Sequence, residues 1–559
     1  MAASGILLLL LALTAAAGVS ASPREMLAYF PQGAYICELV LDHSVNFVMP
    51  LASCTAYWFS FLKPSLSFLA AAIPLLGIML LMWHCAVRLA SRKAAILAVL
   101  VFWFYITKNA HALLWPSNYL ESLLLALNCT AIACVLLLRE GNALRSTGME
   151  LLLAALIGCS FMIKSPLILL PPLLAVREMA SGRLARGETS YGKLAILLFA
   201  PYAMLLPWAW MNRHLFGFTL ALENGRSAQN IISGALGVVC TVEGAYPMAA
   251  LPPNTPVALW AAQTVLAHPL NYAAGVLARI YTIFTWHPAV ISAFVLSCLR
   301  WRRNAASNAL ALFALYFMGI HVLLSVEPRY LMPIYPALAL CAAILPFANT
   351  GKRGPTAEIW LKTASVCAIS ILLAAYLTTA ALLWRYAAGA VPLAKANVRH
   401  PLLLSMSARE KLSAGDIISA RSDAARAVLS GGGHAAALEY MYALLAGGHE
   451  ISPLFRQRLL NCRDRADECL ALEAANALLA GKQPDKAKTY FAEAVQAWSF
   501  GALSFKAVTS ENEAFLRERQ RRLGAPIARE AILNEISRHL PAKLTAEIQS
   551  IIPAKEKAP

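Results

Sequence analysis

The sequence predicts an all-α, polytopic membrane protein that ends in a soluble helical domain, and three observations carry this prediction. Of 559 residues, 59% are hydrophobic and only 14% are charged, whereas soluble domains average about 45–50% apolar and about 25% charged residues. Many apolar runs are long enough to cross a bilayer. The charge also changes along the chain: residues 1–385 contain 24 Lys and Arg against 12 Asp and Glu, while residues 386–559 contain 23 against 18. A membrane domain over 1–385 and a soluble domain over 386–559 are therefore expected.

Apolar runs of bilayer length predict about eleven transmembrane helices in the first domain. The fifth and sixth runs are short and are separated by Lys164, Ser165 and Pro166, so they form either two crossings or one re-entrant pair. Residues 1–21 are either a retained anchor or a cleaved signal peptide. The runs are residues 4–21, 66–90, 94–112, 117–138, 149–163, 165–177, 193–211, 276–298, 305–325, 329–347 and 361–385.

Lys and Arg residues gather in one of the two sets of connecting segments, which predicts the orientation in the membrane. This set lies on the cytoplasmic side if the N-terminus does. The outer loops 22–65 and 212–275 and the C-terminal domain then lie outside the cell's inner (plasma) membrane. The basic residues of the cytoplasmic set are Arg88, Arg92, Lys93, Arg139, Arg145, Arg177, Arg183, Arg186, Lys193, Arg300, Arg302, Arg303, Lys352 and Arg353.

Carboxylates are scarce in the membrane domain, and Asp42 is its only aspartate. Glu38 and Asp42 are spaced i,i+4, so a helix would place both on one face, and His43 follows directly. A carboxylate in a partly dehydrated site has a raised pKa and can act as a general base on an acceptor hydroxyl or amine. The alternative is a solvated loop face without chemistry.

Two cations on the predicted outer side are candidate anion ligands. Lys164 lies in an apolar stretch, where a charge is costly unless it faces a cavity, an anion or the interface; snorkelling to the membrane surface is the alternative. Arg329 begins an apolar run and could either hold a phosphate with two hydrogen bonds or pair with Glu327. The sequence shows no metal-ligand cluster, and a requirement for a divalent metal stays open.

Five segments in chain order resemble those of one family. They are Asn118-Tyr119-Leu120-Glu121, Gly158 to Pro172 around Lys164, the stretch from Pro207-Trp208 through Asn212 and Phe216-Gly217 to Asn224-Gly225, Ala267-His268-Pro269-Leu270-Asn271-Tyr272, and Arg329-Tyr330-Leu331-Met332-Pro333-Ile334-Tyr335-Pro336. The ordered set covers residues 1–350 and resembles the GT-C superfamily of polyprenyl-phosphate-sugar-dependent glycosyltransferases, in the branch of protein O-mannosyltransferases and lipid A aminoarabinose transferases.

The resemblance implies a membrane glycosyltransferase that takes a sugar from a polyprenyl-phosphate lipid and transfers it, with inversion, to a protein, lipid or glycan acceptor. A carboxylate in the first outer loop would act as base, and cations would neutralise the departing lipid phosphate. Together with the spacing of the first outer loop, it makes Asp42 and Glu38 the candidate bases. The candidates for the donor phosphate are Arg329, Lys164, Arg213 and Tyr330, and the further site candidates are His43, Glu121, Asn212 and His268.

Two positions depart from the family pattern. The family has a carboxylate a few residues before a tyrosine, but an alignment on Tyr35 finds none at residues 31–34. The arginine of its "PWtiRN" motif is Met211 here, although Arg213 lies two residues further on. Either these roles have moved to Asp42 or Glu38 and to Arg213, or the chain is a diverged, inactive member. We favour Asp42 as the base.

The C-terminal domain has the helical periodicity of an irregular repeat. Ala474, Ala475 and Leu478, followed by Ala487, Phe491 and Ala494, have spacings similar to one tetratricopeptide helix pair, and a plain helical bundle is the alternative. Such a domain could present a groove to a partner protein.

Two cysteine pairs, Cys37 with Cys54 and Cys462 with Cys469, could each form a disulfide in an oxidising compartment.

Two other function classes remain open at this point. A transporter or flippase of a lipid-linked glycan would show an internal repeat and polar residues at mid-membrane depth, and neither is evident in the sequence. A non-catalytic membrane scaffold would explain the missing family carboxylate. Nothing in the sequence indicates a nucleic-acid partner, because much of the excess positive charge of the membrane domain lies in short cytoplasmic connections.

Overall fold

The structure is a computed structural model that describes most of the chain after residue 30. Before that point it describes only residues 5, 9, 10, 12, 23, 26 and 27, so the predicted first span at 4–21 lies almost entirely outside the described residues, as does His43. The other described ranges are 31–42, 48–62, 66–113, 119–140, 146–187, 189–217, 219, 226–241, 251, 256–300, 305–344, 358–449, 451, 466–501 and 529–552.

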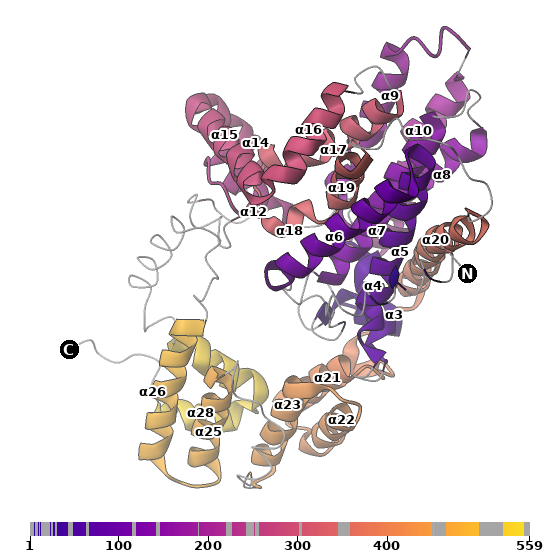
Figure 1. Ribbon diagram of the computed structural model, residues 1–559. Helices are drawn as coiled ribbons and strands as arrows, with labels where there is room; N and C mark the ends of the chain where they lie inside the picture. The colour runs from indigo at the N-terminus through magenta and orange to yellow at the C-terminus, as the bar shows by residue number, and fades with distance from the viewer. Residues whose placement is uncertain are drawn as a thin grey trace. The chain divides into compact units, whose positions relative to one another are not determined.

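Every regular element in these ranges is a helix, which confirms the all-α prediction for the described residues (Figure 1). The chain divides into two compact units: unit 1 contains residues 1–37 and 42–390, and unit 2 contains residues 38–41 and 391–559. An isolated bridge between Val40 and Val391 lies inside unit 2. Segment 38–41 of the predicted first outer loop therefore belongs to the C-terminal unit, and the predicted boundary after residue 385 falls within α20 (Glu358–Gly389).

Long apolar helices make the chain a multi-pass membrane protein. Among the described residues, four are long and apolar enough to cross a membrane: α5 (Leu69–Leu89), α7 (Tyr119–Glu140), the pair α10 (Tyr191–Ala203) and α11 (Leu206–Phe216) taken as one, and α20. The other predicted runs correspond to α6 (Arg92–Leu113), α8 (Thr147–Ile163), α9 (Leu170–Ala180), α15 (Pro269–Trp286) with α16 (Pro288–Arg300), α17 (Ala305–Leu323) and α19 (Tyr335–Ile344).

The predicted run 276–298 is a sharp bend instead of one straight helix. Helices α15 and α16 meet at 105°, with His287 between them. Pro288 has no N–H to donate and disfavours helical conformation in the preceding residue, so the first helix ends at Trp286. If this bent pair is one broken span, the described residues hold five candidate spans.

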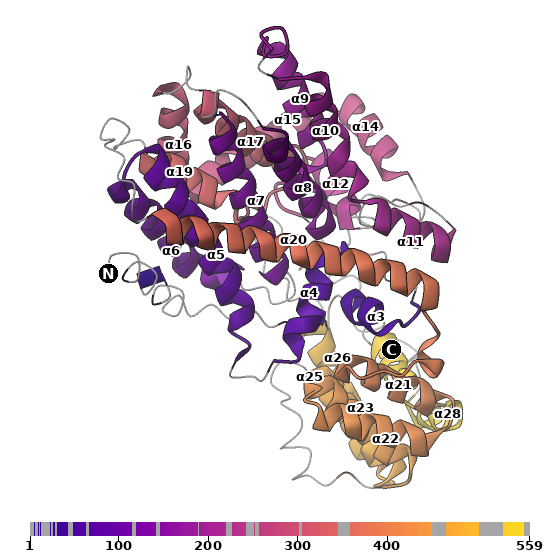
Figure 2. The same ribbon diagram turned by 90° about the vertical axis from the view of Figure 1, so that its right-hand side faces the viewer.

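Helix α20 organises one side of unit 1. It packs against α4 (Pro50–Ser60), α5, α8 and α11, and Figure 2 shows it running across this side of the unit. Helices α5 and α7 are buried along most of their length, whereas α20 and the α10–α11 pair are largely exposed. In a membrane protein such exposed apolar faces contact lipid, so α7 and α8 lie in the interior that positions the site.

One end of α7, α8 and α9 carries six charges that we call the arginine cluster: Arg139, Glu140, Glu150, Arg177, Glu178 and Arg183. Arg139 donates from Nε to Glu150 at 2.8 Å and from one terminal nitrogen to Glu178 at 3.1 Å. The same Glu178 and Glu140 also contact Arg177 and Arg183. The side chains of Arg139 and the three glutamates are at most 2% exposed.

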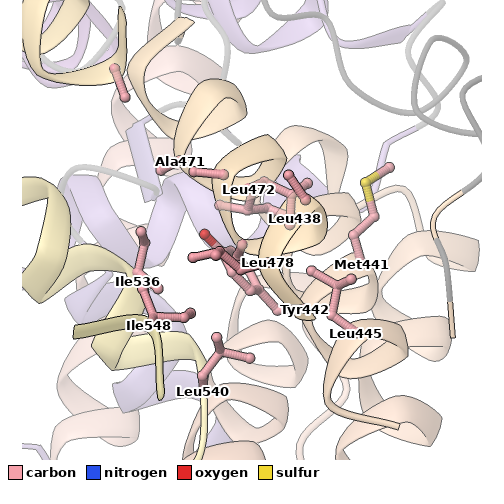
Figure 3. Packing of buried hydrophobic residues seen from close by; sticks show 14 of the residues in the cluster. Leu438, Met441, Tyr442, Leu445, Ala471, Leu472, Leu478, Ile536, Leu540 and Ile548 are labelled. Carbon is pink, nitrogen blue, oxygen red and sulfur yellow. The ribbon is translucent and has the colours of Figure 1, made fainter. Parts of the chain in front are cut away.

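Unit 2 is a set of short helices around one apolar core. Figure 3 shows residues of this core, in which Tyr442 and Leu438 of α23 meet Leu472 and Leu478 of α25 and Ile536 of a helix at 529–539. Its helices include α21 (Pro401–Ser413), α22 (Ile417–Leu429), α23 (Gly433–Ala446), α25 (Ala466–Leu479), α26 (Pro484–Gly501) and α28 (Ala542–Ile551).

The segment predicted as a tetratricopeptide-like pair forms the packed helices α25 and α26. All six residues that gave the prediction, Ala474, Ala475, Leu478, Ala487, Phe491 and Ala494, are buried in the core of unit 2. Cys469 of α25 takes part in a disulfide, and Cys462, its predicted partner, lies outside the described residues. Neither Cys37 nor Cys54 takes part in a disulfide, so the other predicted pairing is absent.

Candidate functional site

Residues from three widely separated segments of the sequence meet in unit 1. Lys164 Nζ lies 3.5 Å from Glu121 Oε2 and 5.4 Å from the centroid of the Tyr330 ring. We call Glu121, Lys164 and Tyr330 the lysine cluster. Glu121 is 4% and Lys164 is 22% exposed at the side chain. Within the described part of the chain, the ammonium group thus has one carboxylate at 3.5 Å and one aromatic face, which leaves donor capacity for a ligand.

The local sequence explains where each of the three residues of the lysine cluster lies on its helix. Lys164 is the C-cap of α8, where its backbone is extended and the following Ser165-Pro166 starts a 3-10 turn, η3 (Ser165–Leu167). A cation is favourable beside the carbonyls at a helix C-terminus, and Glu121 in the first turn of α7 is favourable for the opposite reason. Tyr330 lies in the short helix α18 (Pro328–Leu331), which Pro328 starts.

The Tyr330 hydroxyl belongs to a second group that we call the hydroxyl network: Asn230, Thr241, Ser325, Glu327 and Tyr330. Tyr330 donates to Glu327 Oε1 at 3.0 Å, and Asn230 Oδ1 accepts from Thr241 at 2.8 Å and from Ser325 at 3.1 Å. Tyr330 also lies 3.2 Å from Asn230 Oδ1 and 3.1 Å from Thr241 Oγ1. The imidazole of His321 stacks on the Tyr330 ring at 4.7 Å between centroids.

Arg279 holds the backbone segments that carry this network. Its guanidinium is fully buried and donates to the carbonyls of Gly234, Val238 and Val322, at 2.8 to 3.0 Å. These carbonyls lie at or near the C-terminal ends of α12 (Arg226–Ala235) and α17, where the helix dipoles place partial negative charge. Two helix ends therefore compensate a buried arginine charge, and Arg279 fixes the segments before Thr241 and Ser325.

Glycines allow these segments to approach closely. A side chain at Gly234 would meet the Leu324 carbonyl oxygen at 2.3 Å, and one at Gly275 would meet Gly237 at 2.8 Å. Gly237 also has a φ of 75°, which favours glycine. The local sequence 233–239 thus permits the contact that brings α12, α15 and the 322–325 segment together.

Arg329 lies beside the lysine cluster but has its own carboxylate. Its Nε forms an ion pair with Glu327, and its guanidinium carbon lies 5.5 Å from the Tyr330 ring centroid. This is the pairing that the sequence left open as the alternative to phosphate binding. Of these two cations, Lys164 is therefore the less neutralised.

Other predicted site residues lie in different surroundings. Arg213 is exposed and donates to the carbonyl of Gly217, the residue that ends α11. The amide of Asn212 is buried and donates to Trp208 within the same helix at 3.0 Å. His268 is exposed between α14 (Val257–Ala267) and α15. None of these hydrogen bonds joins the three residues to the lysine cluster.

The two candidate bases, Glu38 and Asp42, differ in the hydrogen bonds that they make. Both Glu38 carboxylate oxygens accept backbone N–H groups of unit 2, from Arg399 and His400, each at 2.6 Å. Asp42 lies in unit 1, and its backbone N–H donates to the Tyr386 hydroxyl at 3.1 Å. The Glu38 carboxylate therefore stabilises the segment that leads into α21.

Sequence reasoning did not find Asn230, Thr241, Ser325 and His321. The first two lie within the predicted outer loop 212–275, where single polar residues are common and give no periodic pattern. A usable signal was the Ser-Gly and Gly-Val-Val run at 233–239, because glycines in an apolar stretch mark close backbone approach.

Within the described residues, no group of three or more His, Cys, Asp or Glu side chains could hold a metal ion. Comparison with protein-family models, curated proteins and solved structures finds no significant match. The function is therefore argued from the arrangement of the residues alone.

Proposed function

We propose that the chain is a membrane glycosyltransferase that transfers a sugar from a polyprenyl-phosphate donor to an acceptor at the outer face of the membrane. The observation that carries the proposal is the lysine cluster: Glu121, Lys164 and Tyr330 come from three of the segments that resemble the GT-C superfamily, and Lys164 contacts both of the others. A chance resemblance in three short motifs gives no reason for their residues to meet.

In this mechanism, Lys164 binds the donor phosphate and stabilises the negative charge that grows on it as the sugar leaves. The Tyr330 ring holds the ammonium group from one side, and Glu121 sets its position from another. Arg329 adds a second positive charge once a phosphate competes with Glu327 for it. Asp42 accepts the proton of the acceptor, whose oxygen or nitrogen attacks the anomeric carbon with inversion.

The proposal includes the finer architecture that the sequence predicts. The membrane domain has a GT-C-like fold of about eleven spans, with a cytoplasmic N-terminus and an extracytoplasmic, tetratricopeptide-like C-terminal unit that binds an acceptor or partner protein. The disulfide at Cys469 supports an oxidising compartment for that unit. Lys164, Glu121 and the hydroxyl network lie at the predicted outer ends of their segments, opposite the arginine cluster.

A transfer assay tests the proposal. Purified protein in nanodiscs is incubated with a panel of radiolabelled polyprenyl-phosphate sugars and a cell-envelope extract, and label in the acceptor fraction is measured. We expect transfer by the wild type, strong loss in Asp42→Asn and Lys164→Ala, and no loss in the matched control Asp485→Asn, at an exposed position of α26. Equal transfer by Asp42→Asn removes Asp42 from the base role. No transfer with any donor favours the scaffold.

A further inference from the structure

The side-chain amide of Asn230 lies beside the lysine cluster, because its Oδ1 is 3.2 Å from the Tyr330 hydroxyl. Among the contacts of the described residues, its Oδ1 accepts from hydroxyl groups, and its Nδ2 has no protein partner. Asn230 is half-buried in α12, and it carries no charge. Its two N–H donors are therefore available to a ligand.

The amide oxygen of Asn230 is the atom that faces the hydroxyl groups. Thr241 and Ser325 donate to Oδ1 at 2.8 and 3.1 Å, and the Tyr330 hydroxyl lies 3.2 Å from it. The hydroxyls also contact one another, because Thr241 Oγ1 lies 2.8 Å from Ser325 Oγ. Since Oδ1 faces this group, Nδ2 on the other side of the amide carbon points away from the hydroxyls.

The surroundings of the hydroxyl network are rigid. Arg279 and the Gly237–Gly275 contact hold the backbone just before Thr241 and Ser325. A donor whose direction is fixed before binding loses little entropy when it meets its acceptor. This preorganisation is a property of sites that discriminate between ligands.

We propose that Asn230 recognises the sugar of the lipid-linked donor by donating from Nδ2 to a sugar oxygen, and this inference rests on the proposed function. Lys164 and Asn230 act at opposite ends of one side chain, because Lys164 lies over the Tyr330 ring and Asn230 contacts its hydroxyl. The cation suits the phosphate, and the neutral amide suits a hydroxyl or ring oxygen. Asn230 is thus a specificity-determining residue.

Binding measurements can separate the two roles. Dissociation constants for polyprenyl phosphate and for each polyprenyl-phosphate sugar of the panel are measured with the full chain in nanodiscs. For the sugar that the wild type binds most tightly, we expect Asn230→Ala and Asn230→Asp to bind about tenfold more weakly. We expect Asn230→Ala to bind plain polyprenyl phosphate as the wild type does. Gln229→Ala and Gln229→Glu, at the neighbouring position of α12, are the matched controls and should change neither constant.

Each other result has a defined meaning. Equal losses for plain and sugar-bearing lipid in Asn230→Ala would overturn the sugar role, as would a wild type that binds every sugar no better than plain polyprenyl phosphate. Unchanged binding of all ligands in both Asn230 variants would also overturn it. A wild type that binds none of the lipids contradicts the proposed function itself. Lys164→Ala, which should lose both ligands, shows that the phosphate measurement responds.

Discussion

Helices α7 and α8 carry charged side chains at both ends, and the two ends are built differently. The arginine cluster has three arginines and three glutamates, and its central side chains are at most 2% exposed. The lysine cluster, about 20 Å away by the rise of α8, has one cation that is 22% exposed and one carboxylate at 3.5 Å. In the arginine cluster, arginines and glutamates pair with one another, whereas Lys164 has one ion pair, at 3.5 Å, among the described residues.

This difference separates a structural role from a binding role. A buried charge is tolerated only when its partners satisfy it, and removal of one partner leaves the others unpaired in a low dielectric. An ammonium group with a single long ion pair is weakly held by the protein and can exchange that contact for a ligand oxygen. We therefore expect changes at the arginine cluster to reduce stability and changes at the lysine cluster to reduce function.

The largest expected effect is on stability, from Arg139→Met. Met fills similar space but leaves Glu150 and Glu178 without their main cation, so we expect a loss of about 3–5 kcal/mol in the free energy of unfolding. Denaturant-induced unfolding of the purified protein in mixed micelles measures it. Arg92→Met, an exposed position at the start of α6, is the control and should change this value by less than about 0.5 kcal/mol. A loss as small in Arg139→Met would show that the cluster is dispensable.

The second largest expected effect is a slower transfer of the sugar by the Lys164→Ala variant. Loss of one cation at a developing phosphate charge is expected to lower kcat/KM about 100-fold. The free energy of unfolding should change by less than about 1 kcal/mol, because the lost ion pair is long and partly exposed. Lys93→Ala on α6 is the control for both measurements. If Lys164→Ala unfolds as easily as Arg139→Met, the contrast between the two clusters is wrong.

Unit 2 contains a self-satisfied network whose charges titrate in an accessible range. His539 donates from both ring nitrogens to Glu439 and Glu535, at 2.9 Å each, and its ring stacks on Tyr442. Burial opposes a charge on His539, but the hydrogen bonds to both carboxylates outweigh it and raise the pKa of the imidazolium above its ordinary 6.5. The hydrogen bond from His539 lowers the pKa of Glu535 from 4.5 to about 2.

The sign of the pH dependence follows from these directions. The contribution of His539 is complete below pH 6.5 and is lost as the pH rises through its higher folded pKa. The contribution of Glu535 is complete above pH 4.5 and is lost as the pH falls toward 2. Amide hydrogen exchange of α23 and of the helix at 529–539, corrected for intrinsic rates, should thus be slowest between these limits. His539→Gln should flatten the alkaline side, and exposed His449→Gln should not.

Much of the fold could be predicted because apolar length is a strong signal, as in α5, α7 and α20. The same signal missed the bend at His287, where one proline outweighs an uninterrupted apolar run. For the site, motif order identified Glu121, Lys164 and Tyr330. It left open whether Arg329 pairs with Glu327 or binds a phosphate. It did not find that Asn230 and Thr241 reach Tyr330, because these contacts join residues 100 and 89 positions apart. Only the packed backbone around Arg279 creates them.

The smallest expected effect comes from Glu38→Gln, which applies the same contrast to the two candidate bases. Both Glu38 oxygens accept backbone N–H groups just before α21, as in a helix cap, and Gln can supply only one such oxygen. We expect a loss of about 1 kcal/mol in the stability of unit 2, seen as faster hydrogen exchange in α21, and transfer equal to that of the wild type. Glu493→Gln, at an exposed position of α26, is the control. Lost transfer with unchanged exchange would instead make Glu38 the base, and would show that a carboxylate with both oxygens bound can still do chemistry.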